Sequence, residues 1–495
     1  MTTKVQALTI ITLGATLVIA SAQTTQPAAA ATAPPPPALS STEQMIKDIK
    51  NPAKWMSWGA DMRVRNEYFK DLLTLDPRAP LAEQDYFRFR ARVWTSIKPV
   101  EDVSLNARLT AEPRYWDKPA GYTSFKGNIG MDWREGVFDN LNVNWTNIAG
   151  LPARIKVGRQ DLRFSADPFP GDGWLIADAT PNDGSWTFFF DSARFTYDLV
   201  DQHTKFEAIG IIQDAWDDGW MPTINNQNYL LTDQNEKGVI VQAANSSIKG
   251  VDLTGYFIYK NDSRVSSATG DNADIYTVGG RVNGMLDNHW GYWLEGAYQF
   301  GRKQDNRVVY PAPSSNYRTL NSYGLNSRVS YLFKDQYKNQ LDLSFELLSG
   351  DDPNTGDDEM FDSLWGRWPR WSEIGLYSAA PEARIGQQAN LIRLGPTWSL
   401  NPIQDMVFSA SYYALFAMEG IATRGASPST GPVFAGNAGL PGSGQFRGSY
   451  ISASMDYKFS RHMIGQLWAE FQFPGNYYVN RDPMSFLRAQ VMFIF

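Results

Sequence analysis

Side chains alternate between apolar and polar from about residue 58 to the end of the chain, and this limits the possible folds more than any other feature. Successive side chains of a β-strand point to opposite faces, so a period of two predicts strands with one apolar and one polar face. In 86–97, Phe87 and Phe89 belong to the apolar row, whereas Arg88 and Arg90 belong to the polar row. We therefore predict an all-β fold.

Eighteen segments carry this alternation. They lie near 58–68, 86–97, 103–112, 141–147, 153–160, 185–198, 203–212, 238–245, 251–260, 275–283, 290–300, 322–333, 339–348, 389–400, 406–416, 447–459, 462–473 and 485–495. An even number of antiparallel strands brings both ends of the series to the same end of the sheet.

The connections between these segments alternate between short and long. Even-numbered segments are followed by tight joins such as 98–102 and 401–405, and odd-numbered ones by long stretches such as 113–140 and 349–388. Outer-membrane barrels have short periplasmic turns and long extracellular loops. The sequence thus predicts a transmembrane antiparallel β-barrel of about 18 strands, in the outer membrane of a Gram-negative-type bacterium.

The two ends of the sequence support export to that membrane. Residues 1–22 have a lysine, an apolar run and a small-x-small site at Ala20–Ala22, which predicts a signal peptide. Residues 23–54 are expected to form an Ala/Pro-rich periplasmic linker whose final part is either a short helix or a frayed tether. The barrel is assigned to 55–495, and its last segment resembles the C-terminal signal of outer-membrane barrel proteins; a buried final strand is the alternative reading.

Basic side chains are concentrated in the polar rows of the first six segments, which we expect to line the lumen. Charged groups facing lipid near the midplane cost about 2–4 kcal/mol, so these rows should point inward. Nine bases stand against three acids, Asp61, Glu67 and Glu112, in a chain whose net charge is −7. The predicted lining residues are Arg63, Arg65, Arg88, Arg90, Arg92, Arg108, Arg154, Lys156 and Arg194.

An arginine-rich lumen favours anions that carry carboxylates, because the guanidinium fork matches carboxylate geometry. The alternative is that these residues brace the wall through ion pairs, for instance Arg63 with Glu67, or Arg108 with Glu112. The row of Arg88, Arg90 and Arg92 contains no acid of its own and is the strongest candidate for contact with an anion.

Catalysis and metal binding have little support in the sequence. The chain has no cysteine and three histidines, which lie beside short turns, so we expect no enzyme, no cofactor and no nucleic-acid partner. The acidic run in 350–359 could hold calcium weakly through Asp351, Asp352, Asp357 and Asp358. A solvated loop is the favoured reading of that run.

Several stretches resemble the alginate export family of outer-membrane barrels. They are WGADMRVRNEYF (58–69), YFRFRARVW (86–94), GRQD (158–161), GDGWLIADATPNDGSWTFFFDSARFTYDL (171–199) and SGDDPNTGDDEMFDSLWGRWPRW (349–371). The resemblance implies a monomeric eighteen-stranded barrel with an arginine-rich passage for an anionic uronate polymer, gated by loops or turns. It also implies lining or loop-anchoring roles for Arg63, Arg65, Arg88, Arg90, Arg92, Arg159, Asp191 and Arg194; for Arg159 and Asp191, loop anchoring is the expected role.

The sequence is compatible with three functions. The first is export of an alginate-like anionic polysaccharide, with periplasmic secretion partners reached through the linker. The second is an anion-preferring diffusion porin for small anions, which would share the same wall. The third is a barrel that binds or hydrolyses surface sugars through its loops. In all three, outer-membrane lipid surrounds the wall.

Overall fold

The computed structural model describes residues 41–71, 82–118, 131–132, 136–162, 189–216, 234–265, 271–304, 316–352, 354–366, 371–374, 389–419, 444–478 and 481–495. The chain divides into two compact units, Met1–Lys47 and Asp48–Phe495, and the described strands all belong to the second. The predicted signal peptide at 1–22 and the linker residues 23–40 lie outside the described residues. No described helix combines the length and the apolar character that a membrane span requires.

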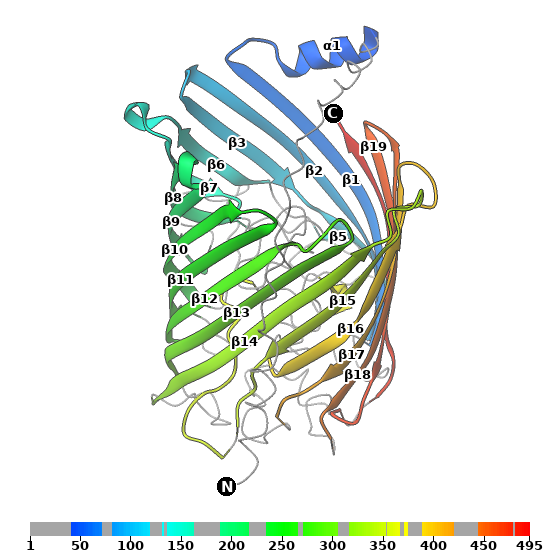
Figure 1. Ribbon diagram of the computed structural model, residues 1–495. Coiled ribbons are helices and arrows are strands. Elements are labelled where there is room, and N and C mark those ends of the chain that lie inside the picture. The colour runs from blue at the N-terminus through cyan, green and yellow to red at the C-terminus, as the bar shows by residue number, and fades with distance from the viewer. Residues whose placement is uncertain are drawn as a thin grey trace, which may run out of the picture. The chain divides into compact units, whose positions relative to one another are not determined.

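Antiparallel strands form one sheet that closes into a barrel (Figure 1). The last strand pairs with the first, from Asp61↔Ile494 to Lys70↔Ser485. The ring contains β1 (Met56–Lys70), β2 (Glu83–Val100), β3 (Val103–Ala111), β6 (Val137–Trp145), β7 (Ala153–Gln160), β8 (Phe190–Leu199), β9 (Thr204–Gln213), β10 (Gln234–Ile248), β11 (Val251–Arg264), β12 (Ala273–Met285), β13 (Trp290–Gln304), β14 (Tyr317–Leu332), β15 (Gln340–Leu348), β16 (Leu391–Leu400), β17 (Met406–Phe416), β18 (Phe446–Ser460), β19 (Met463–Pro474) and β20 (Met484–Ile494).

Two further short strands pair with the ring at its edge and are not counted among its members. β4 (Arg114–Lys118) continues the pairing of β2 beyond β3, and β5 (Met131–Asp132) pairs with β4. The closed barrel therefore has eighteen strands, and each of the eighteen predicted segments falls on one of them. The predicted fold class is confirmed.

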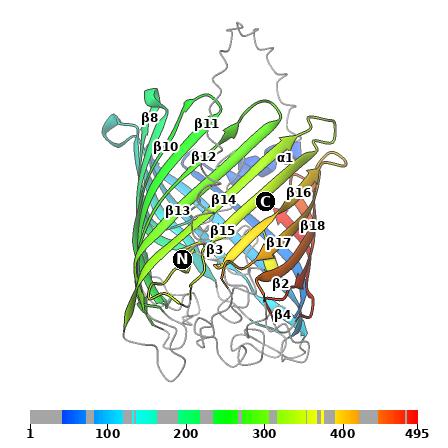
Figure 2. The ribbon, with the colours of Figure 1, turned by 60° about the horizontal axis from the view of Figure 1, so that its bottom comes forward.

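The short connections lie together at one end of the barrel, the upper end in Figures 1 and 2. Examples are the joins from Val100 to Val103 and from Ser460 to Met463. Two of these turns contain single 3-10 turns, η2 (Ile148–Gly150) and η3 (Val200–Gln202). Residues of left-handed backbone conformation, such as His203 with φ 48°, close them tightly.

The two faces of the wall differ as the alternation predicts. On β1, Met62 is 51% exposed, whereas its neighbours Arg63 and Arg65 are almost fully buried. The outward face is apolar because it contacts lipid, and the polar rows point into the lumen. Outward tryptophans gather near the short turns, including Trp145, Trp290 and Trp398. Their amphipathic rings suit the interface between membrane and water.

A helix, α1 (Ser41–Lys50), precedes the first strand, in the part of the linker where we expected either a helix or a tether. Glu43 in its first turn interacts favourably with the positive end of the helix dipole. The residues at its end contact the barrel. Trp58 Nε1 donates a hydrogen bond of 2.8 Å to the Ile49 carbonyl, and the Lys50 ammonium lies 5.9 Å from the centroid of the Phe495 ring.

Candidate functional site in the barrel lumen

Five arginines of β1 and β2 form a ladder on the inner wall. The strand register places Arg63 opposite Arg90 and Arg65 opposite Arg88, while Arg92 lies opposite Asp61. Like charges directly opposite on neighbouring strands repel each other. A buried ladder of this kind therefore requires carboxylates nearby.

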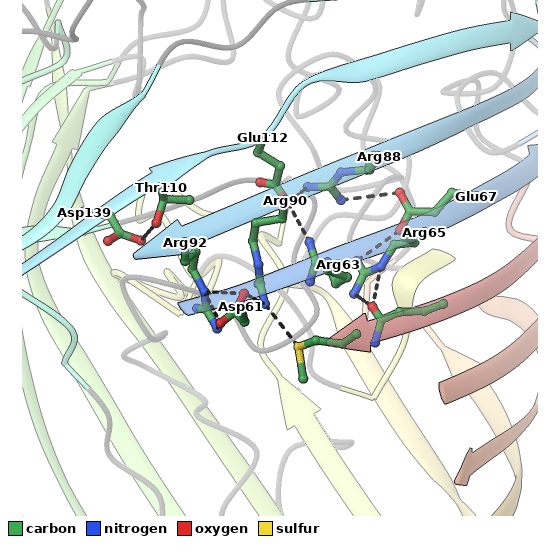
Figure 3. Close-up of polar contacts among 12 residues, drawn as sticks. Asp61, Arg63, Arg65, Glu67, Arg88, Arg90, Arg92, Thr110, Glu112 and Asp139 are labelled. Atoms are coloured by element: carbon green, nitrogen blue, oxygen red, sulfur yellow. Dashed lines mark hydrogen bonds and ion pairs between the residues drawn. The ribbon is translucent and has the colours of Figure 1, made fainter. Parts of the chain in front are cut away.

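Three carboxylates are inserted between these arginines (Figure 3). Asp61 lies 2.5 Å from Arg92 and 3.6 Å from Arg90, and Glu112 lies 2.6 Å from Arg63 and 2.9 Å from Arg88.

Glu67 completes the network. It lies 3.2 Å from Arg65, 3.4 Å from Arg88 and 2.5 Å from Arg488 of β20. The row of Arg88, Arg90 and Arg92 contains no acid of its own, but each of its arginines lies within 4.0 Å of an acid that it shares with other arginines. These side chains thus brace the seam where the first and last strands meet.

The structure gives the arginines other ion-pair partners than the sequence suggested. Arg63 binds Glu112, not the neighbouring Glu67. Arg108 binds Asp139 at 2.7 Å and Asp161 at 2.9 Å. A bulge between β3 and β6 leaves Asp139 outside the regular pairing, and its fully buried carboxylate also accepts a hydrogen bond from the Thr110 hydroxyl.

A second basic group lies on β7 and β8. Lys156 is directly opposite Arg194, and Arg154 is two residues closer to the short turn. Arg194 pairs with Glu207 of β9 at 2.5 Å, and Arg154 pairs with Asp198 at 3.6 Å. Together with Asp139 and Asp161, these acids reduce the excess of positive charge that we expected from nine bases and three acids.

Exposure of the lining cations rises towards the short-turn end. The side chains of Arg63 and Arg88 are 2% and 0% exposed, whereas those of Arg92, Arg194 and Arg154 are 19%, 26% and 45% exposed. Lys156 is half-buried and has no carboxylate within 4.0 Å in the described part of the chain. The cations that a solute can reach are therefore those on the periplasmic half of the wall.

Arg159 and Asp191 form an ion pair near the other end of β7 and β8. Arg159 Nε lies 3.0 Å from the Asp191 carboxylate, and its Nη1 donates a hydrogen bond of 3.1 Å to the Phe138 carbonyl. The guanidinium also lies 3.7 Å from the ring centroid of Phe189. These contacts tie β6, β7 and β8 to Phe189, the residue that precedes β8.

The connection between β15 and β16 contacts the inner wall, which the sequence did not reveal. We call its described segments 354–366 and 371–374 the strap. The Asp362 carboxylate lies 2.7 Å from Lys303 Nζ of β13, and the Asp362 backbone N–H donates to Gln299. Trp365 is fully buried beside Gly238 of β10, where a Cβ would lie 2.5 Å from its ring.

The second segment of the strap contacts another part of the wall. Glu470 of β19 accepts hydrogen bonds from the Ser372 hydroxyl at 3.1 Å and from the backbone N–H groups of Glu373 at 2.9 Å and Ile374 at 2.8 Å. The Trp371 carbonyl accepts a hydrogen bond of 3.0 Å from the Tyr450 hydroxyl. In the eighteen-stranded ring, β19 is nearly opposite β10, so the two described segments of the strap contact opposite walls of the lumen.

The acidic run at the start of this connection is tied to the wall by arginine. Arg318 of β14 binds the Asp351 carboxylate through both terminal nitrogens at 2.8 and 3.0 Å. It also donates to the Asp357 carbonyl and lies 3.8 Å from Asp358. Asp352 accepts a hydrogen bond from the Asn354 backbone N–H. Among the described residues, no three potential metal-ligating side chains cluster, so the weak calcium reading gains no support.

Comparisons with known proteins agree with this architecture. The structure is similar to that of the outer membrane protein opdK from Pseudomonas aeruginosa, with a TM-score of 0.51 and 9% identity over 89% of this chain and 99% of that one. It is also similar to P. aeruginosa OccK5 (OpdH), with a TM-score of 0.49 and 11% identity over 88% and 97% of the two chains. No curated protein matches the sequence significantly. At these identities the likeness concerns the fold.

The sequence match to a family is more informative. A family model described as alginate export matches residues 54–491, which is most of the chain. The match agrees with the resemblance seen in the sequence, and the closed barrel places the protein in the outer membrane as a channel. This chain therefore belongs to the alginate export family.

Proposed function

We propose that this barrel passes an anionic polysaccharide of the uronate type across the outer membrane. We also propose that residues 1–22 are a signal peptide that directs export of the protein itself. The observation that carries the proposal is the opposition of Lys156 and Arg194 on the accessible half of the inner wall. Two cations in direct opposition repel each other. Arg194 is already paired with Glu207 at 2.5 Å, so Lys156 is the cation of this group that a passing carboxylate would bind.

The surroundings of Lys156 strengthen this reading. The strongest electrostatic influences of charged groups on Lys156 come from one acid, Asp161, and three bases, Arg194, Arg108 and Arg154. A lumen with low-dielectric walls concentrates the field of such a group, and rings of Arg or Lys are a common basis of anion selectivity in pores. The side chains offered to the cargo are therefore Arg92, Arg108, Arg154, Lys156 and Arg194, while Arg63, Arg65, Arg88 and Arg90 hold the wall.

Ion selectivity in planar bilayers tests the proposal. The purified full chain should conduct anions in preference to cations, and uronate oligomers should block the current more strongly than neutral oligosaccharides of equal length. Cation preference would reject the proposal. Anion preference without block by oligomers would instead support a diffusion porin for small anions, and a closed pore with sugar binding at the loops would support the third reading.

A further inference from the structure

Glu373 of the strap occupies a carboxylate-binding position on the arginine-rich wall. Arg488 Nη1 donates a hydrogen bond of 3.1 Å to one Glu373 oxygen, and Nη2 lies 3.0 Å from the other oxygen as an ion pair. Both side chains are buried, at 4% and 0% exposure. Arg488 therefore holds a second carboxylate besides that of Glu67, through one charge-assisted hydrogen bond and one ion-pair contact.

The walls around Arg488 hold its guanidinium in place. The ring centroids of Phe486 and Trp468 lie 5.0 and 5.3 Å from the guanidinium carbon, and Glu67 binds it from β1. Arg488 thereby joins the strap to the ladder of β1 and β2. A fixed guanidinium loses little conformational entropy when one carboxylate replaces another.

Residues 371–374 of the strap lie among charges of opposite sign. Glu470 receives the Ser372 hydroxyl and two backbone N–H groups of the strap, which places two glutamates, 373 and 470, close together. Two neighbouring carboxylates repel each other in a low-dielectric site. Arg488 offsets this repulsion, so the docking of 371–374 depends on the ion pair between Glu373 and Arg488.

We propose that Glu373 is a built-in substitute for the carboxylate of the cargo, which keeps the strap across the lumen until an anionic polymer displaces it from Arg488. The inference rests on the proposed function. It assigns to Arg488 a carboxylate subsite on the path of the cargo, and to the strap the role of a gate.

The length of the cargo should decide whether displacement succeeds. Glu373 is attached to the same chain as Arg488, so it competes at a high effective concentration. A single uronate carboxylate competes poorly with it. A polymer that already contacts Lys156 and Arg194 presents its further carboxylates at a comparable effective concentration, so oligomers should open the strap where monomers do not.

A reporter at residue 372 tests the gate. Because the chain has no cysteine, Ser372→Cys in the full chain gives a single thiol at a position that is 2% exposed. Its rate of reaction with N-ethylmaleimide measures release of the strap. We expect a slow rate in this background and a rate at least about tenfold higher after Glu373→Gln, within the range typical of couplings between sites. Asp274→Asn, which removes a carboxylate from Arg302 on the outward face, is the matched control and should leave the rate unchanged.

Adding ligand to the Ser372→Cys protein tests the gate without any change at residue 373. Uronate oligomers should speed the reaction at least about fivefold, and the monomer at equal carboxylate concentration or neutral oligosaccharides should not. Equal rates with and without Glu373, together with no effect of oligomers, would overturn the gate even if oligomers block the current. Fast labelling after Glu373→Gln without any response to uronate would support the ion pair between Glu373 and Arg488 as the contact that holds the strap. It would reject uronate polymers as the cargo that releases it.

Discussion

The indole of Trp365 occupies the space that a side chain at residue 238 would fill. A Cβ added to Gly238 would lie 2.5 Å from the ring, and Phe190 contacts the indole edge-on at a centroid distance of 6.4 Å. The Lys260 ammonium lies 5.8 Å from the same ring. The wall of β10 thus contains a notch in which the strap is fixed, opposite the site where Glu373 binds Arg488.

Trp365→Ala should detach this end of the strap. Truncation of a buried tryptophan costs about 3–5 kcal/mol, and here the loss falls on the strap because the strands keep their backbone pairing. We expect a higher single-channel conductance with no loss of the folded barrel on unheated SDS gels. Trp290→Ala, an exposed outward position, is the control. An unchanged conductance would contradict a strap that narrows the lumen.

Filling the notch from the wall should give the same result. In Gly238→Ala the new methyl group meets Trp365 and the Tyr259 carbonyl, so the indole has to leave or shift. Gly255→Ala is the matched control, because a Cβ there meets nothing within 4 Å. Conductance should rise in the first variant and stay constant in the second. The same conductance in both would show that the notch does not hold the strap.

The deep ion pairs should matter for stability more than the exposed ones. Glu112→Gln leaves Arg63 without its buried carboxylate and removes one of the two that bind Arg88. Loss of a buried partner costs about 3–5 kcal/mol in comparable sites. Asp198→Asn removes the partner of Arg154, where both side chains are more than a third exposed, and should cost less than about 1 kcal/mol. Denaturant unfolding in detergent measures both. Equal losses of unfolding free energy in the two variants would reject a bracing role for the ladder.

Charge reversal at Lys156 should reduce anion selectivity. Lys156→Glu places a carboxylate opposite Arg194 and neutralises the accessible group. Two unit charges 4 Å apart interact by about 1 kcal/mol even in water. A change of this size in the energy of a passing ion should lower the ratio of anion to cation permeability at least about fivefold. Reversal potentials in a salt gradient measure this ratio. Lys338→Glu in the turn between β14 and β15 should leave it nearly constant, and an equal fall in both variants would argue against a selective site.

The anchor at Asp362 should hold over a wide range of pH. Burial alone would raise the pKa of the Asp362 carboxyl, but the ammonium groups of Lys303 and Lys260 hold the pKa well below its ordinary value. A lowered carboxyl pKa contributes stability above the unfolded pKa, about 3.9, which is lost only as pH falls through the folded pKa. The rate of labelling at residue 372 has to be divided at each pH by the rate for a free thiol, because maleimide reacts with the thiolate. This normalised rate should show no step from titration of Asp362 between about pH 5 and 8.

Asp362→Asn provides the comparison for this anchor. Removing the charge should raise the rate of labelling over the same pH range, because Lys303 loses the carboxylate at 2.7 Å. A normalised rate that changes steeply between pH 5 and 8 with Asp362 present, and not after Asp362→Asn, would contradict a carboxylate that stays ionised over this range.

The barrel could be read from the sequence because strand alternation is a local property. The pattern around Phe87 and Arg88 specifies which side faces lipid, and the alternating lengths of the connections specify which end is periplasmic. Strand limits were less accurate where a bulge breaks the period. The segment expected at 141–147 is β6 (Val137–Trp145), because Asp139 bulges out of the pairing with β3.

The strap left one trace in the sequence, the tryptophans at 365 and 371 in a connection otherwise rich in acids and glycine. Aromatic residues of this number are costly to expose, and they could have suggested burial. They could not indicate against which strands, since loops have no period that fixes the direction of their side chains.

By itself the sequence determined the eighteen strands, their two faces and the inward direction of the arginines, because each of these follows from the spacing of neighbouring residues. Tertiary structure alone decided which carboxylate meets which guanidinium. Arg63 finds Glu112 across 49 positions and Arg488 finds Glu67 across 421. Such pairs depend on the register and closure of the whole ring, and on a loop that crosses it, and neither is encoded in any local pattern.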